Sequence, residues 1–443
     1  MKRRRFLAAA GATVALPSHA QVQKPSDKLS IAAIGMGGQI QGHVGKLLKL
    51  GHHLAAFCDV DENQIRNSQK RHGDPVAKIH TYKDYRVLFE KEKGIDAVVI
   101  ATPDHWHMPI CRAAMAAGKH IYCEKPLTHS LAEARELREA SRASKLITQT
   151  GNQGSASPNL RRSMELIAAG VFGDITDIHV WHPVHAPPYG TARPEDADPI
   201  PEGLDWDFWC GPAPARPFKA EIYHPAKWRA WYDFGNGTLG DFCCHSFNMP
   251  VRALDLDYPE KISVSARKMD QETFPEACTV IYHFAAKGKR GPMKLHFYTG
   301  GDVPPESSTK ELSATFGGLP RVGCLLEGTK GQLQSGLWNS QCYVRLNDDA
   351  KFLGADNHEA EKAIPESIPR SIGHMEEWIS ACGGEGTCFA DFNFGGHLTE
   401  IGLAGVVALR MQKEIPWDGP NMKVPGMPEA DRFIRTEDRK TYL

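Results

Sequence analysis

Two short stretches carry side chains whose types and spacing suit proton transfer. Lys125 lies between Glu124 and Pro126, and the proline biases the lysine towards an extended backbone. An ammonium held there can donate a hydrogen bond to an alkoxide or a carbonyl oxygen. Asp241 and His245 stand four residues apart, so a helix would place them on one face, where a carboxylate can orient an imidazole or share its proton. Each pair, taken alone, also fits a solvated surface contact.

A glycine-rich turn near the N-terminus indicates a dinucleotide site. Strands are expected at residues 29–34 and 54–58, with a helix at 43–50 between them. The turn after the first strand contains Gly35, Gly37 and Gly38, which allow the backbone to approach a pyrophosphate closely. Asp59 follows the second strand, where a carboxylate accepts hydrogen bonds from ribose hydroxyls and repels a 2'-phosphate, so NAD is predicted over NADP.

The third glycine of this fingerprint is absent. Its place is taken by Ile40, and Gly42 is expected to assume its packing role against the strand.

Helices and strands alternate through the rest of the first half, which predicts a doubly wound parallel sheet over residues 28–150. Ligands of such sheets bind beyond the carboxyl ends of the strands. Besides the three glycines, Asp59 and Lys125, the residues expected to line the cofactor are Gln39, Ile40, Thr102, Asp104, Trp106, His107, Glu124 and Asn152.

Strand-like runs dominate the second half, at residues 175–182 and at intervals between 262 and 346. They predict an α+β domain over residues 151–420 with a large open, mainly antiparallel sheet, followed by a tail at 421–443. Candidate sugar contacts here are Trp181, Tyr223, Trp228 and Arg229. Aromatic faces stack on sugar rings and arginine binds hydroxyls, although tryptophans also fill protein cores.

In order and spacing, these motifs resemble the Gfo/Idh/MocA oxidoreductases, a family that includes inositol dehydrogenase and glucose–fructose oxidoreductase. The motifs are Gly35-x-Gly37-Gly38, Asp59, the segment 101–107, Glu124-Lys125-Pro126 and Asp241-x-x-x-His245. The resemblance implies that Lys125, Asp241 and His245 form a catalytic set: the imidazole takes a hydroxyl proton, Asp241 orients it and Lys125 stabilises the oxyanion. Asn248 stands where the family pattern has a further aspartate.

The resemblance also implies a sugar, glycoside or cyclitol substrate, and self-association into a dimer or tetramer through the open sheet. The formal net charge of -1 gives no reason to expect nucleic acid or anionic membranes as partners. No metal is predicted. His105 and His107 lack a further ligand at suitable spacing, and His179, His182 and His185 fall on a strand and loop rather than a helix.

The first twenty residues look like a twin-arginine export signal. Arg3-Arg4-x-Phe6-Leu7 precedes an apolar run too short to span a bilayer, and small residues at Ser18 and Ala20 suit cleavage after Ala20. A periplasmic location is therefore expected. The eleven cysteines form no C-x-x-C pair and are odd in number, which favours buried thiols in a protein folded before export.

Export constrains the chemistry, because little free NAD is expected outside the cytoplasm. The sequence therefore predicts an oxidoreductase whose NAD stays bound and is reset by a second sugar or by reversal. Reversal also allows a redox-neutral glycosidase, as in NAD-dependent glycosidases of this superfamily. That alternative ranks second because those enzymes depart from the Glu124-Lys125-Pro126 pattern. A non-catalytic protein that binds NAD or sugar ranks third.

Overall fold

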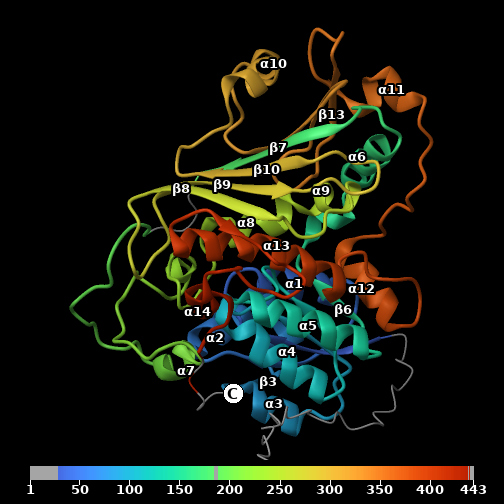
Figure 1. Cartoon of the computed structure of the whole chain (residues 1–443). Coiled ribbons are helices and arrows are strands. Elements are labelled where there is room, and N and C mark those ends of the chain that lie inside the picture. Colours follow the sequence, from blue (N-terminus) through green and yellow to red (C-terminus); the bar gives the residue numbers. More distant parts are fainter. Residues whose placement is uncertain (1–27, 184–187, 438, 440–443) are drawn as a thin grey trace, which may run out of the picture.

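The computed structural model describes residues 28–183, 188–437 and 439. It contains two stacked α/β bodies, with a helical layer between their sheets (Figure 1). The expected export signal and His185 lie outside the described residues. Among the described residues, no helix has the length and apolar character needed to cross a bilayer.

The first body is built on six parallel strands in the order β3-β2-β1-β4-β5-β6. The strands are β1 (Ser30–Ile34), β2 (His53–Cys58), β3 (His80–Tyr82), β4 (Ala97–Ile100), β5 (His120–Cys123) and β6 (Thr148–Thr150). The helices are α1 (Ile40–Lys49), α2 (Glu62–His72), α3 (Tyr85–Lys91), α4 (His107–Ala116) and α5 (Leu131–Ala143). Every residue of β4 and β5 is buried, as expected for parallel strands covered on both faces, and the doubly wound prediction is confirmed.

The second body contains a nine-stranded sheet in the order β14-β13-β12-β11-β7-β10-β9-β8-β15. Its strands are β7 (Ile175–His182), β8 (Lys261–Arg267), β9 (Ala277–Phe284), β10 (Met293–Thr299), β11 (Gly323–Gly328), β12 (Gly331–Gln334), β13 (Tyr343–Leu346), β14 (Leu353–Gly354) and β15 (Ile415–Pro416). Only β7 and β10 pair in parallel among these described strands, so the mainly antiparallel prediction is confirmed.

Helices of the second body divide between the two faces of this sheet. The inner face, turned towards the first body, packs against α8 (Gly237–Ser246), α9 (Asn248–Ala253) and α13 (Phe392–Met411). The outer face carries α10 (Glu306–Phe316), which lies at the top of Figure 1. The remaining helices are α6 (Pro158–Ala168), α7 (Trp206–Cys210), α11 (Glu359–Lys362), α12 (His374–Cys382) and α14 (Asp431–Ile434).

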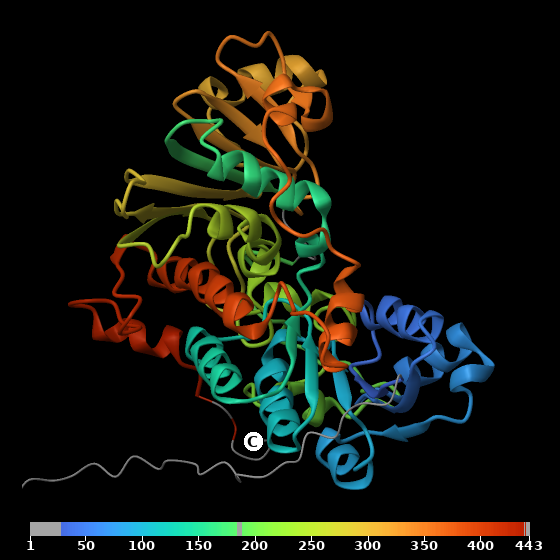
Figure 2. The ribbon, with the colours of Figure 1, turned by 90° about the vertical axis from the view of Figure 1, so that its right-hand side faces the viewer.

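Helix α13 joins the two bodies, and Figure 2 shows it between the upper sheet and α5. Glycines let it approach its neighbours: a Cβ at Gly402 would lie 2.1 Å from the sulfur of Cys243 on α8. Glu400 of α13 has a fully buried side chain, and its carboxylate lies 2.7 Å from Arg135 and 2.9 Å from Arg138 of α5. A buried ion pair thus ties the second body to the first.

The cysteines behave as small core residues. All eleven are free thiols, ten of them buried and Cys388 half-buried. Burial raises the pKa of the Cys278 thiol to about 12. The expected buried thiols are therefore confirmed.

Candidate active site

A cavity of about 1010 Å³ lies between the carboxyl ends of the parallel strands and helix α8. One end is lined by the glycine turn and Asp59, and the other by Lys125, Asp241 and His245. Both bodies therefore supply its walls. This is the strand-end position at which doubly wound sheets bind their ligands.

The glycine turn has room for a dinucleotide. Gly35 has φ +83°, and a Cβ there would lie 2.7 Å from the backbone nitrogen of Thr102, so only glycine fits. A Cβ at Gly37 or Gly38 would meet nothing within 4 Å. Gln39 begins α1 without a side-chain cap, which leaves the amides of the helix N-terminus available to a phosphate.

Asp59 directly follows β2 and holds the glycine turn in place through hydrogen bonds. Its carboxylate accepts hydrogen bonds from the amides of Met36 at 2.6 Å and Asp61 at 2.8 Å. Burial raises the pKa of Asp59 to about 6, against the effect of these two bonds. Each carboxylate oxygen keeps a second lone pair, so Asp59 can still accept a ribose hydroxyl.

Two expectations about this turn are wrong. Ile40 is 1% exposed and packs in the core below β1 instead of lining the cavity. Gly42 is exposed on α1, and a Cβ there would meet nothing within 4 Å, so it has no packing role. Helix α1 stands far enough from the sheet to accommodate an isoleucine where the fingerprint has glycine.

The strand-end candidates divide into two groups. Thr102, Asp104, Trp106 and Glu124 line the cavity as predicted, together with Gln39. His107 and Asn152 do not line it, and both predictions are corrected. The ring nitrogens of His107 lie 2.8 Å from the carbonyl of Pro126 and 3.0 Å from that of Thr102, so His107 joins two loops. The amide of Asn152 donates to the carbonyl of Cys244 in α8.

Glu124 is held rigidly behind Lys125. Its Oε1 lies 2.7 Å from Nε2 of His43 and accepts a hydrogen bond of 2.9 Å from Gln153. Burial by itself raises the pKa of Glu124, but the hydrogen bond from His43 and the nearby positive charges outweigh it and lower the pKa. A Cβ at Gly151 would lie 2.4 Å from the Glu124 carboxylate, which explains the glycine there.

Lys125 and Asp241 form a close ion pair on the cavity wall. Nζ of Lys125 lies 2.5 Å from Oδ1 of Asp241, and Nε of Arg229 lies 3.5 Å from Oδ2. Burial alone lowers the pKa of Lys125, but the charges of Asp241 and Glu124 outweigh it and raise the pKa above its ordinary value. Lys125 is therefore an ammonium at neutral pH.

His245 completes the set one helical turn beyond Asp241. Burial, and then the charge of Lys125, lower the pKa of His245 to about 3, so its imidazole is neutral at physiological pH. Its buried Nδ1 has no hydrogen-bond partner among the described residues. We expected Asp241 to orient this ring, but the Asp241 carboxylate bonds Lys125 instead.

The cavity also contains groups that sequence reasoning missed. Asp104 was expected only as a cofactor contact, yet burial and the charge of Asp241 raise its pKa to about 8. It accepts a hydrogen bond of 3.1 Å from Asn236. Trp338, in the loop after β12, lines the cavity with its ring centre 6.0 Å from that of His245. No sequence signal marks this tryptophan, because the sheet order brings its loop to the site.

Of the four candidate sugar contacts, two line the cavity. Trp228 and Arg229 do so, with the guanidinium 4.2 Å from the centre of the indole ring. Trp181 does not: it is 1% exposed on the outer face of the sheet, and its indole donates to the carbonyl of Pro320 at 2.7 Å. Tyr223 is also a core residue, 2% exposed in a cluster with Trp231. The predicted sugar contacts of Trp181 and Tyr223 are therefore wrong, because both side chains pack inside the protein.

A glycine turn open to a strand-end cavity, an acid after β2 and a lysine–aspartate pair on the opposite wall define a two-domain dinucleotide-binding protein. Two family models match the chain. Residues 29–152 match the oxidoreductase family, NAD-binding Rossmann fold, and residues 190–289 match its C-terminal alpha/beta domain. Together they span just over half of the chain, which belongs to the Gfo/Idh/MocA oxidoreductase family. The predicted family and its NAD cofactor are confirmed.

Curated relatives match over about a third of this chain. Inositol 2-dehydrogenase 1 of Saccharopolyspora erythraea is 29% identical over 156 residues, which are 34% of this chain and 45% of the relative. A glycosyl hydrolase family 109 protein of Solibacter usitatus is 26% identical over 160 residues, 34% of this chain and 36% of the relative. The chain thus spans less than half the length of these two relatives.

Solved structures share the whole fold. The WlbA dehydrogenase of Chromobacterium violaceum, in complex with NADH and UDP-GlcNAcA, superposes with a TM-score of 0.62 at 16% identity and covers 88% of this chain and 96% of its own. Levoglucosan dehydrogenase in complex with NADH gives 0.58 at 16% identity, covering 87% and 98%. At such identities the likeness establishes the two-body architecture alone.

Proposed function

We propose that this protein is an NAD-dependent oxidoreductase that acts on a hydroxyl of a sugar, glycoside or cyclitol. The observation that carries the proposal is the cluster of Lys125, Asp241 and His245 on the cavity wall, at the end away from the glycine turn and Asp59. A cation, an anion and a neutral imidazole there suit removal of a hydroxyl proton.

The residues that would hold NAD are those of the glycine turn, the N-terminus of α1 and Asp59. Their fit rests on the open space beside Gly37 and Gly38 and on the remaining acceptor capacity of Asp59. When bound, NAD supplies the hydride acceptor that an oxidation of C–H needs.

The chain itself handles the proton and the developing charge. Neutral His245 accepts the hydroxyl proton, since an unprotonated imidazole has a nitrogen lone pair to receive it. The Lys125 ammonium stabilises the oxyanion that forms, and Asp241 fixes this ammonium through their 2.5 Å contact. Asp241 therefore acts as a positioning residue for Lys125 rather than for His245.

Support for a carbohydrate comes from the aromatic walls and from the relatives. Trp228 and Trp338 line the cavity, and the indole of Trp338 is 44% exposed. Exposed indole faces stack on the apolar faces of sugar rings. The matched relatives include inositol dehydrogenases, and a structural neighbour was solved with L-sorbose.

The proposal includes export through the twin-arginine route to the periplasm, with NAD retained through turnover. The motif at residues 3–7 and the set of free thiols support it. It also includes a homo-oligomer formed through the outer face of the second sheet. On that face, Ser265, Arg267 and Lys294 of β8 and β10 are exposed, as an unpaired sheet face offers to a second copy.

A redox-neutral glycosidase is the second candidate. Relatives named glycosyl hydrolase family 109 proteins favour it. So does Asp104, whose raised pKa, about 8, keeps a neutral carboxyl in the cavity that can protonate a leaving group. In this candidate, oxidation of a ring carbon acidifies the neighbouring C–H, the aglycone is eliminated, water adds to the double bond that forms, and the ketone is reduced again.

The test uses protein purified without added cofactor. Denaturation would release the bound nucleotide for identification, while sugars and aryl glycosides are added to native protein and reduced nicotinamide is followed by absorbance. One bound NAD per chain, together with a rise in absorbance that corresponds to a single turnover, supports an oxidoreductase that retains its cofactor. Aglycone release without net reduction favours the glycosidase. Steady reduction of added NAD by nucleotide-free protein contradicts retention, and binding without any turnover leaves a non-catalytic protein.

A further inference from the structure

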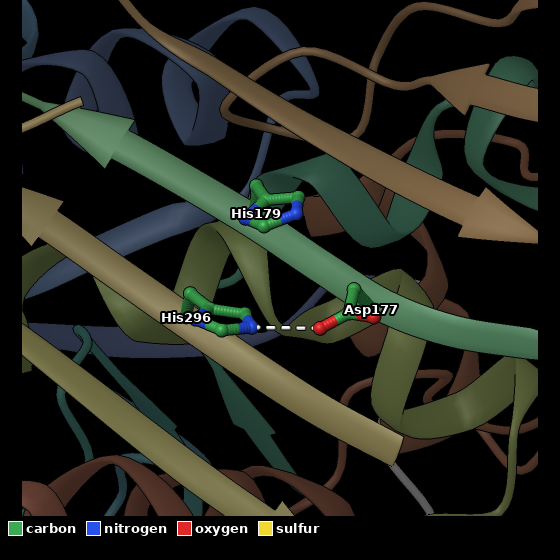
Figure 3. Close-up of side chains that lie close together, drawn as sticks. All are labelled: Asp177, His179 and His296. Atoms are coloured by element: carbon green, nitrogen blue, oxygen red, sulfur yellow. Dashed lines mark hydrogen bonds and ion pairs between the residues drawn. The ribbon is translucent and has the colours of Figure 1, made fainter. Parts of the chain in front are cut away.

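A second cluster of reactive side chains lies on the outer face of the nine-stranded sheet, away from the cavity. Asp177 and His179 project from β7, and His296 projects from the neighbouring strand β10 (Figure 3). One donor atom from each residue lies within 4.8 Å of the others. Nε2 of His296 is 2.9 Å from Oδ1 of Asp177.

The parallel pairing of β7 and β10 produces this arrangement. His179 is directly opposite His296, and their rings stack with centroids 4.7 Å apart. Asp177 is two residues before His179 and therefore on the same face. Figure 3 shows a nitrogen of each ring directed to the side on which Asp177 lies. The sequence could not predict this group, because more than a hundred residues separate His296 from His179.

We propose that these side chains bind a divalent transition metal ion of the Zn²⁺ class, with Glu327 of β11 as fourth ligand. Oε2 of Glu327 lies 3.0 Å from Nε2 of His179. Imidazole nitrogens and carboxylate oxygens are both zinc ligands, and the two negative charges balance the ion. Metal–ligand bonds of about 2.0 Å place tetrahedral donors roughly 3.3 Å apart, so the three donor atoms within 4.8 Å of one another must draw closer, and Glu327, outside that set, must move further.

A second layer of hydrogen bonds already orients the ligands. The hydroxyl of Tyr298 lies 3.1 Å from Nδ1 of His179, which leaves Nε2 directed at Glu327. Ser308 and Gln332 donate to the two oxygens of Glu327 at 2.9 and 2.8 Å. Such outer partners fix the tautomer and the direction of metal ligands.

The site is sheltered but can be reached by an ion. His179 has a side chain only 4% exposed, whereas that of Asp177 is 32% exposed and that of Glu327 23%. His182, which the sequence did not favour as a ligand, is not part of this cluster, because it points to the inner face and stacks on Phe242. The metal site is therefore separate from the cavity and independent of the proposed activity.

The test uses the full chain without a histidine tag, stripped with a chelator and titrated with Zn²⁺ alone. His296→Ala removes a ligand, and Asp177→Asn keeps the shape while removing a charge. The matched control is His283→Ala, on the neighbouring strand β9, where the ring bonds Ser263 at 2.9 Å outside the cluster. Unfolding of each metal-free variant, measured first, establishes that it folds.

Wild type and His283→Ala are expected to bind one more zinc ion per chain than His296→Ala, by equilibrium dialysis. Asp177→Asn is expected to bind at least about tenfold more weakly. Co²⁺ at the site should give the visible absorption of tetrahedral coordination without thiolate bands. Equal zinc binding by wild type and His296→Ala would overturn the proposal, as would thiolate absorption or saturation only in the millimolar range.

Discussion

Nζ of Lys125 lies 2.5 Å from Oδ1 of Asp241, although the two residues belong to different bodies of the protein. Lys125 follows β5 of the parallel sheet, and Asp241 lies in α8 below the second sheet. The ion pair closes the cavity at the point where both bodies meet. Asp241 holds the Lys125 ammonium in position and helps to raise its pKa.

Replacing Lys125 by methionine should lower kcat by about 10²–10⁴-fold, since the oxyanion loses its cation. Bound NAD should remain, because the glycine turn is unchanged. Turnover of a confirmed sugar and nucleotide content per chain are the measurements. Lys49→Met, at an exposed position of α1, is the matched control. Unchanged turnover in Lys125→Met would remove Lys125 from the mechanism.

The dependence of kcat/KM on pH should reflect the low pKa of His245. Above a pKa of about 3 the imidazole is neutral and can accept a proton. Therefore kcat/KM, which reflects groups of the free enzyme, should change little between about pH 5 and about pH 7. His245→Ala should lose most of the activity across this range. An acidic limb centred near the ordinary histidine pKa would contradict a desolvated base.

Asp104→Asn should stabilise the protein at alkaline pH. Burial raises the pKa of Asp104 from 3.8 to about 8, so between these values the folded state holds a proton that the unfolded state has lost. Stability from this group is complete below pH 3.8 and is lost as the pH rises through about 8. The asparagine carries no such charge, so its melting temperature should exceed that of wild type by several degrees at high pH.

The measurement is the melting temperature of both proteins across pH. Asp348→Asn, at an exposed site, is the control and should give a difference from wild type that does not depend on pH. A parallel decline of wild type and Asp104→Asn with rising pH would show that Asp104 ionises at its ordinary pKa.

Gly37→Val should abolish NAD retention with little effect on folding. A Cβ at Gly37 would meet no protein atom within 4 Å, and the valine would occupy the space proposed for the pyrophosphate. Nucleotide content after purification and the melting temperature are the two measurements. Gly42→Ala, one helical turn away and facing solvent, should retain NAD. Full nucleotide content in Gly37→Val would place the dinucleotide elsewhere.

Trp338→Ala should raise KM for the sugar by about fivefold and leave kcat within a few-fold, since stacking on an exposed indole contributes about 1 kcal/mol. Phe316→Ala on α10 is the matched control, because Phe316 is 42% exposed, close to the 44% of Trp338, but lies outside the cavity. Equal KM values for wild type and Trp338→Ala would exclude this stacking contact.

Hydrophobic periodicity was sufficient to predict most strands and helices and both sheets. The family resemblance, rather than spacing, implied that Lys125 and Asp241 share one site, and the structure brings them together in an ion pair. The aromatic candidates were harder to place. Trp181 and Trp228 have the same chemistry, and only the sheet order decides that Trp181 of β7 faces away from the cavity.

Other misses have a similar physical origin. His107 and Asn152 lie at strand ends beside the cofactor turn, yet their polar atoms are used by backbone carbonyls of neighbouring loops. Hydrogen bonds of this kind, between a side chain and the backbone of a distant loop, cannot be predicted before the loops are placed in space. Ile40 occupies a fingerprint position, but the distance between α1 and the sheet follows from packing rather than from the motif.

The ion pairs of Glu400 with Arg135 and Arg138 hold the two bodies of the protein together. Separating the two bodies would leave the fully buried carboxylate of Glu400 without its arginine partners, at a cost of about 3–5 kcal/mol. Because Lys125 and Asp241 come from different bodies, the same ion pairs also keep these two cavity residues in register, so a contact far from the cavity secures its shape.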